Sequence, residues 1–130
     1  MNLESPKITA NKSQVEMYNF LTTVGNYEQI MPSSKEKFEV LGPEKFTFGL
    51  KGLPEITLKI IKTVEPNLVV LGSDSDKFPF SLSIHIDSAE TEKSHVQLFF
   101  NGKFNAMMAM MVKGPLQKFI NTLSENISKL

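Results

Sequence analysis

The middle of the chain alternates between apolar and polar residues, the pattern of strands with one buried face. From Phe80 to Asp87 every second residue is phenylalanine, leucine or isoleucine, with serine, histidine or aspartate between them. Six strands are predicted, at Lys35–Leu41, Glu44–Lys51, Glu55–Val64, Asn67–Ser73, Pro79–Ser88 and Ser94–Phe104. Short turns rich in Gly, Pro, Asn and Asp join them, so neighbouring strands must pair in antiparallel fashion. The adjacent Ile60 and Ile61 interrupt the period, which predicts a bulge or bend.

Two short helices are predicted before these strands. The chain begins with an extended segment, Leu3–Ala10, in which Pro6 fits an edge strand. A helix follows, because Asn11 can cap a first turn and Ser13–Glu16 matches the capping-box pattern. Gly25-Asn26 is a stop signal for this helix. A second, shorter helix is expected over Tyr27–Met31, ending before a proline.

A long helix, about Asn105–Leu130, closes the chain. From Leu116 onward, apolar residues recur at three- and four-residue spacing and form one stripe that can lie on the sheet. The preceding run, Ala106–Val112, contains four methionines and is apolar on every side. A helix on a sheet hides only one side, so the rest of this run must face a cavity, other loops or a second chain. Gly114-Pro115 separates the two parts and predicts a kink.

Composition narrows the classes of function. The length of 130 residues fits one domain, residues 1–130. The absence of cysteine excludes disulfides, thiolate metal sites and a cysteine nucleophile. The 14 positive charges are all lysines and balance 14 acids, so no nucleic-acid partner is predicted. No run is long and apolar enough for a membrane span or a signal peptide, so the expected location is cytoplasmic.

No catalytic, cofactor or metal motif stands out. The seven glycines form neither a phosphate-binding loop nor a dinucleotide fingerprint, so no cofactor is predicted. His85 and Asp87 share one face of a strand, but alternation places that face outward, and His95 has the same parity. Asp74 and Asp76 lie in a polar loop that lacks the glycine and the later glutamate of a calcium-binding EF-hand. No catalytic residue and no metal ligand are therefore predicted.

The element order resembles the helix-grip architecture of the SRPBCC superfamily, which includes START-like lipid-transfer domains, polyketide cyclases and birch-pollen-allergen-like proteins. The resemblance covers the whole chain and is carried by Asn11–Glu16, Met31-Pro32 and Gly114-Pro115 at their places in that order. It implies an α+β fold in which a seven-stranded curved antiparallel sheet wraps around the long C-terminal helix. Two short helices would lie between strands 1 and 2, and an apolar cavity between sheet and helix. The superfamily shares no catalytic motif, so none is transferred to this chain.

We therefore expect binding or transport of a small hydrophobic ligand, such as a lipid, a fatty acid or a polycyclic metabolite. The expected lining residues are aromatic and aliphatic strand positions together with methionines, which adapt to irregular ligands. They are Phe38, Phe46, Phe48, Leu58, Phe80, Leu82, Phe100, Met107, Met108 and Met111. The inward sheet positions offer almost no ionisable group, which favours binding over catalysis.

Two alternatives remain open. The first is a cyclase or dehydratase acting on a polyketide-like substrate, for which Tyr18, Tyr27, Glu28 and Asn101 are the available polar candidates. The second is a protein-interaction domain, with a homodimer as one form of it. Its contact patch would consist of the methionine run, or of Phe99 and Leu71.

Overall fold

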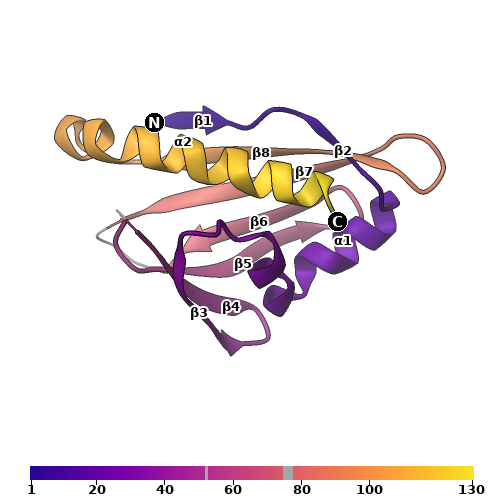
Figure 1. The fold of residues 1–130 in the computed structure, drawn as a ribbon, viewed down its shortest axis with the longest axis horizontal. Helices are drawn as coiled ribbons and strands as arrows, with labels where there is room; N and C mark the ends of the chain where they lie inside the picture. The colour runs from indigo at the N-terminus through magenta and orange to yellow at the C-terminus, as the bar shows by residue number, and fades with distance from the viewer. Residues whose placement is uncertain (52, 75–77) are drawn as a thin grey trace.

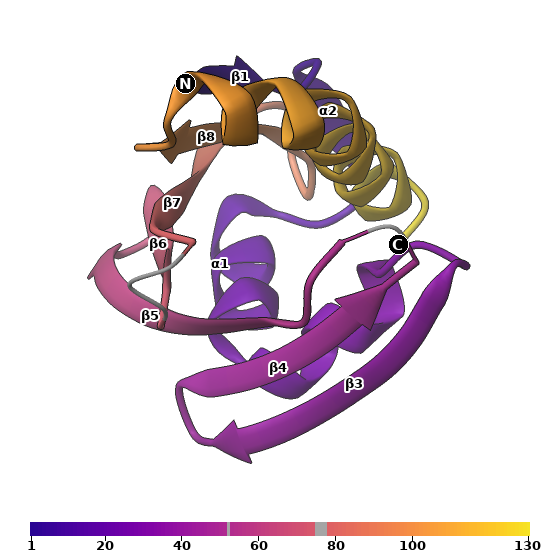
Figure 2. The ribbon, with the colours of Figure 1, turned by 90° about the vertical axis from the view of Figure 1, so that its left-hand side faces the viewer.

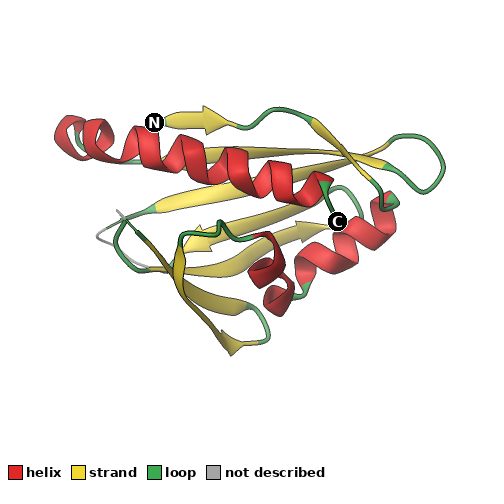
Figure 3. Ribbon diagram, viewed as in Figure 1, coloured by secondary structure: helices red, strands yellow, loops and turns green. Residues whose placement is uncertain are grey.

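A computed structural model describes residues 1–51, 53–74 and 78–130. Its strands are β1 (Asn2–Glu4), β2 (Ile8–Ala10), β3 (Lys35–Gly42), β4 (Lys45–Leu50), β5 (Ile56–Val64), β6 (Leu68–Ser73), β7 (Phe80–Ser88) and β8 (Ser94–Gly102). Its helices are α1 (Gln14–Thr22), the 3₁₀ helix η1 (Val24–Ile30) and α2 (Ala106–Ser128). None of these helices is long and apolar enough to cross a membrane. Figure 3 shows the three helices against a single sheet.

All strands pair in antiparallel fashion, in the order β1-β8-β7-β6-β5-β4-β3, and β2 also pairs with β8. Figure 2 shows that the sheet curls from β8 round to β3 and that α2 runs along the open side of the curl. The helix contacts β1, β2, β8 and η1. This arrangement confirms the predicted α+β architecture with a curved sheet around the long C-terminal helix.

The first predicted strand is divided into β1 and β2, because Pro6 has no backbone N–H to donate to β8. Ser5 compensates for the break. Its backbone N–H donates to the carbonyl of Leu98 and its hydroxyl accepts from the Leu98 N–H, each at 2.9 Å. The side chain of Gln97 also donates to the Ser5 carbonyl at 2.9 Å. The edge of the sheet therefore stays hydrogen-bonded through a buried serine.

Alternation along the central strands is confirmed. In β7 the apolar side chains between Phe80 and Ile86 are buried, whereas His85 and Asp87 are exposed. The interruption predicted at the paired isoleucines is also present, since the β5–β6 register shifts between Ile60 and Lys62. The outward histidine and aspartate therefore belong to the solvent-facing side of the sheet.

Side-chain caps define where the helices begin. Ser13, not Asn11, caps α1: its hydroxyl accepts from the Glu16 N–H at 3.2 Å and Glu16 accepts from the Ser13 N–H at 3.1 Å. The hydrogen bond from the Ser13 backbone N–H to the carboxylate is the main cause of the lowered pKa of Glu16. Asn105 caps α2 by accepting from the Met108 N–H at 2.8 Å. The expected stop at Gly25-Asn26 is wrong, because α1 ends earlier and these residues lie within η1.

Tyr27 ties η1 to α1 and to the sheet. Its hydroxyl donates to the Leu21 carbonyl at 2.7 Å, and its ring stacks on Phe46 with centroids 4.9 Å apart. Burial raises the pKa of Tyr27 well above its ordinary value of 10.0. The buried side chain thus stays protonated under conditions in which an exposed tyrosine ionises.

Replacing Tyr27 by phenylalanine should leave the Leu21 carbonyl without its donor, at a cost of about 1–3 kcal/mol near neutral pH. Above about pH 10 the unfolded wild-type chain releases the Tyr27 proton while the folded chain keeps it, so wild-type stability falls as the pH rises. Tyr27→Phe lacks this loss. Urea unfolding at pH 8 and pH 11 should therefore show a smaller stability difference between the two proteins at pH 11. A constant difference would contradict the assignment.

The two parts of α2 should respond differently to truncation. Leu123 is on the buried side of α2 and is 1% exposed, whereas Met110 is 85% exposed. Leu123→Ala should destabilise the protein by about 2–5 kcal/mol because it leaves a void. Met110→Ala should change stability by no more than about 0.5 kcal/mol. Urea midpoints of the two variants test this, and equal losses would show that the methionine end of α2 is covered in solution.

Candidate functional site

The predicted strand phenylalanines fill the interior beneath α2. Phe46 and Phe48 are fully buried, and stacked rings run from Phe38 through both of them to Phe119 on α2. The centroids of successive rings are 5.3, 6.0 and 5.3 Å apart. These side chains therefore form a packed aromatic layer between β3, β4 and the helix.

A second aromatic cluster lies near the first turns of α2. Phe80 and Phe100 stack with centroids 4.8 Å apart, and Phe78 and Phe104 pack beside them. Gly102 allows this packing, because a Cβ there would lie 2.6 Å from the Phe104 ring. Leu58 and Leu82, two other predicted lining residues, are also buried. The interior positions thus contact one another.

Open space remains between α2 and the described residues that flank β4 and β5. We call the larger opening, of about 410 Å³, the Pro115 groove. Its described lining consists of Pro32, Ser34, Leu50, Lys51, Leu53, Gly114, Pro115, Lys118, Phe119 and Thr122. A smaller opening of about 280 Å³, the Met108 groove, is lined by Pro54, Glu55, Ile56, Thr57, Ser73, Phe78 and Met108.

The Pro115 groove has an apolar floor and a polar rim. Leu50 and Phe119 are buried at its base, and Leu53 is half-buried beside them. Lys51 and Lys118 are exposed at the edge. The groove can therefore hold an apolar body while leaving a charged or hydrated end in contact with solvent.

Two dipeptides singled out by the resemblance, Met31-Pro32 and Gly114-Pro115, supply residues to this groove. A Cβ on Gly114 would meet no atom within 4 Å, which shows how much room the helix leaves there. The helix is one continuous element across Pro115, from Ala106 to Ser128. Because proline has no backbone N–H, Pro115 cannot donate to the carbonyl of Met111, one turn earlier in the helix.

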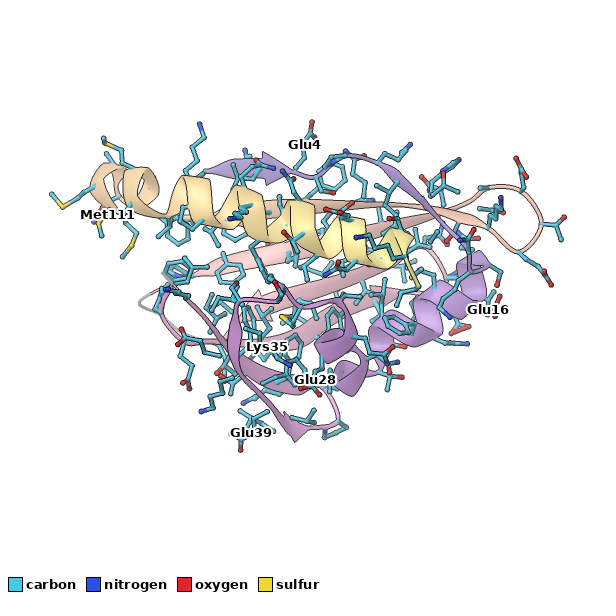
Figure 4. The ribbon with its side chains drawn as sticks, viewed as in Figure 1. Glu4, Glu16, Glu28, Lys35, Glu39 and Met111 are labelled. Atoms are coloured by element: carbon cyan, nitrogen blue, oxygen red, sulfur yellow. The ribbon has the colours of Figure 1, made fainter. Side chains whose placement is uncertain are left out.

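None of the ten predicted ligand-binding residues lines the Pro115 groove, and Met108 lines the Met108 groove. Met107 and Met111 are placed differently from the expectation, being 75% and 70% exposed. Figure 1 shows the first turns of α2 reaching past the neighbouring strands, and in Figure 4 Met111 projects away from the body of the protein. Both side chains are therefore largely uncovered by the described residues.

The polar candidates for catalysis do not gather at either groove. The Tyr27 hydroxyl donates to the Leu21 carbonyl. Glu28 forms an ion pair with Lys35 at 2.9 Å, and Figure 4 shows these two residues side by side. Tyr18 is buried and Asn101 is exposed on β8. Tyr18 is on α1, Tyr27 and Glu28 are on η1 and Asn101 is on β8, and none of these residues lines either groove.

Groups that bind metals are also dispersed. Within residues 1–51, 53–74 and 78–130, no three His, Asp or Glu side chains are close enough to hold an ion. Asp74 instead accepts from Lys45 at 2.9 Å and pairs with Lys59 at 3.5 Å, and the Lys45 bond is the main cause of its lowered pKa. Asp76, the other acid of the predicted polar loop, lies outside the described residues.

The two histidines make surface contacts, and one residue of the proposed contact patch is buried. His85 packs edge-on against Phe99, with ring centroids 4.9 Å apart, and His95 is 3.2 Å from the Thr9 hydroxyl. Leu71 is fully buried, so the expectation that it forms an exposed contact patch with Phe99 is wrong. Alternation in β6 turns Leu71 inward.

Solved structures share this geometry, although no protein-family model and no curated protein sequence matches the chain. A point mutant of norcoclaurine synthase from Thalictrum flavum has a TM-score of 0.76 at 13% identity, over 99% of this chain and 92% of that chain. A START superfamily protein from Mycobacterium smegmatis has a TM-score of 0.69 at 10% identity, over 98% and 97%. The protein XoxI from Bacillus cereus has a TM-score of 0.77 at 7% identity, over 98% and 93%. The chain thus has the helix-grip fold of the SRPBCC type.

Proposed function

We propose that the protein binds a small hydrophobic molecule, in the cytoplasm, and that the Pro115 groove is its binding site. The observation that carries this proposal is an opening of about 410 Å³ with a buried apolar floor at the junction of α2 and the sheet. Small-molecule sites usually measure about 300–1,000 Å³ and are mostly apolar with a few polar groups. The groove matches that description in size and in lining.

The aromatic layer supports the floor of this site from below. Phe119 lines the groove and stacks on Phe48, which in turn stacks on Phe46. Stacked, fully buried rings hold the floor in one position, and a preformed surface binds a ligand without first having to be ordered. The predicted interior residues thus contribute by positioning the groove, and Met108 offers a second apolar contact at the adjacent Met108 groove.

Binding is favoured over a cyclase or dehydratase activity by the chemistry of the lining. No described aspartate, glutamate or histidine lines the Pro115 groove, and its titratable groups are the two exposed lysines. Proton transfer would need an acid or base within hydrogen-bond reach of the substrate. The fold itself accommodates small molecules in other proteins, since norcoclaurine synthase from Thalictrum flavum has been solved in complex with dopamine and hydroxybenzaldehyde.

Leu53→Ser should weaken the binding of a neutral apolar dye, N-phenyl-1-naphthylamine, by about three- to tenfold, because it removes part of the apolar lining. Leu41→Ser is the matched control, since Leu41 is half exposed near the end of β3 and does not line the groove. Fluorescence titration measures both affinities, and native mass spectrometry of the purified protein detects a retained ligand. Absence of dye binding to the wild type, or equal weakening by both variants, would refute the proposal.

A second candidate function, self-association, rests on the exposed methionines. Met107, Met110 and Met111 are 70–85% exposed on one end of α2, where apolar side chains would be covered by a second copy of the chain. We propose a homodimer through this end as the alternative role of the run.

Sedimentation velocity tests the homodimer. A dimer formed through the methionines should dissociate in Met110→Lys, because the substitution places a charge in an apolar contact. Val15→Lys, at a 54% exposed position of α1, is the control and should leave the sedimentation coefficient unchanged. A wild-type protein that remains monomeric across the concentration range would contradict this alternative.

A further inference from the structure

The charged side chains that line the Pro115 groove are both cations. Lys51 directly follows β4, and Lys118 lies one helical turn beyond Gly114 on α2. Among the described residues, no carboxylate forms an ion pair with either lysine. Both ammonium groups are thus available to a bound molecule.

Three acids on neighbouring elements are paired with lysines that do not line the groove. Glu28 of η1 pairs with Lys35 at 2.9 Å, and Glu125 near the end of α2 pairs with Lys129 at 3.1 Å. Glu55, which directly precedes β5, pairs with Lys37 at 3.3 Å. These pairs reduce the influence of the surrounding carboxylates on the groove and leave its two lysines uncompensated.

The described lining of the groove contains no carboxylate. Residues 94–124, which include β8 and most of α2, contain three lysines and no aspartate or glutamate. Although the whole protein has zero formal net charge, the described lining of the groove carries two lysines and no acid. A local excess of one sign over an apolar surface selects for ligands of the opposite charge.

We infer that the ligand of the Pro115 groove is an amphipathic anion, with an aliphatic or aromatic body and a single free carboxylate. This inference rests on the proposed function. The apolar body would lie on Leu50, Leu53 and Phe119, and the carboxylate would accept hydrogen bonds from Lys51 and Lys118 at the rim. The exposed hydroxyl of Ser34 provides another donor at the same edge.

A carboxylate suits this rim better than a doubly charged phosphate. The chain has no arginine, so it lacks the planar fork that holds phosphate oxygens in pairs. Two lysines at an exposed edge act as point charges and leave one side of the ligand's anionic group hydrated. The arrangement therefore fits a fatty-acid-type molecule whose charged end remains near solvent.

The experiment compares three ligands with the same chain and different end groups: octanoate, octanol and octylamine. Each competes against N-phenyl-1-naphthylamine, which carries no charge at neutral pH, for the wild type and for Lys51→Gln, Lys118→Gln and Lys113→Gln. Lys113 is an exposed lysine of α2 outside the groove and serves as the matched control. Circular dichroism confirms that all variants are folded.

Octanoate should bind the wild type about tenfold more tightly than octanol, and octylamine should bind more weakly than either. Each groove variant should lower octanoate affinity about two- to fivefold and leave octanol unaffected. Lys113→Gln should behave as the wild type, and 0.5 M NaCl should reduce the preference for octanoate.

Two failures are distinguishable. Equal affinity for the three ligands, unchanged by the lysine substitutions, would overturn the anionic ligand class while leaving apolar binding in the groove intact. If no ligand displaces the dye and Leu53→Ser has no effect on dye binding, both the ligand class and the proposed function are overturned.

Discussion

The packing of one apolar stripe of α2 into the concave side of the sheet is the contact on which the rest of this structure depends. Leu116, Ile120, Leu123 and Ile127 are all buried at three- and four-residue intervals, which keeps them on one side of the helix. β1, β2, β8 and η1 meet the helix along this stripe. The three strands form one end of the curled sheet, and η1 packs on β3 and β4 at the other end, so the helix connects the two ends.

The grooves form where that packing ends. A curved sheet can cover only part of a long helix, and the Pro115 groove lies beside Gly114 and Pro115, where Leu50 and Leu53 face α2. Aromatic side chains fill the interior on either side, from Phe38 to Phe119 and from Phe78 to Phe104. Aromatic side chains thus occupy the interior, and the Pro115 groove lies at the junction of helix and sheet.

This location determines which chemistry the site can perform. The floor offers apolar area, and the rim offers ammonium groups and hydroxyls, so the groove can attract and orient a molecule. The two histidines, His85 and His95, belong to the outer face of the sheet and do not line the groove. Ligand selection by an apolar surface and two lysines is consequently a simpler account than catalysis.

The sequence by itself was sufficient for the element order, the antiparallel pairing, the apolar face of the sheet and the bulge after Ile60, because these depend on local periodicity and turn chemistry. The capping box at Ser13 and the outward position of His85 follow from the same short-range rules. The division of the first strand was less accessible, since it depends on a serine side chain replacing part of the backbone ladder.

Only the tertiary structure decided which apolar residues face open space. The sequence predicts both Phe48 and Met111 as ligand-binding residues, yet Phe48 is fully buried and Met111 is largely exposed. Periodicity assigns a side chain to a face of its element, but coverage of that face depends on neighbours distant in the chain. For the groove those neighbours are Pro32, Leu53 and Pro115, which come together only when the sheet curls and α2 closes over it.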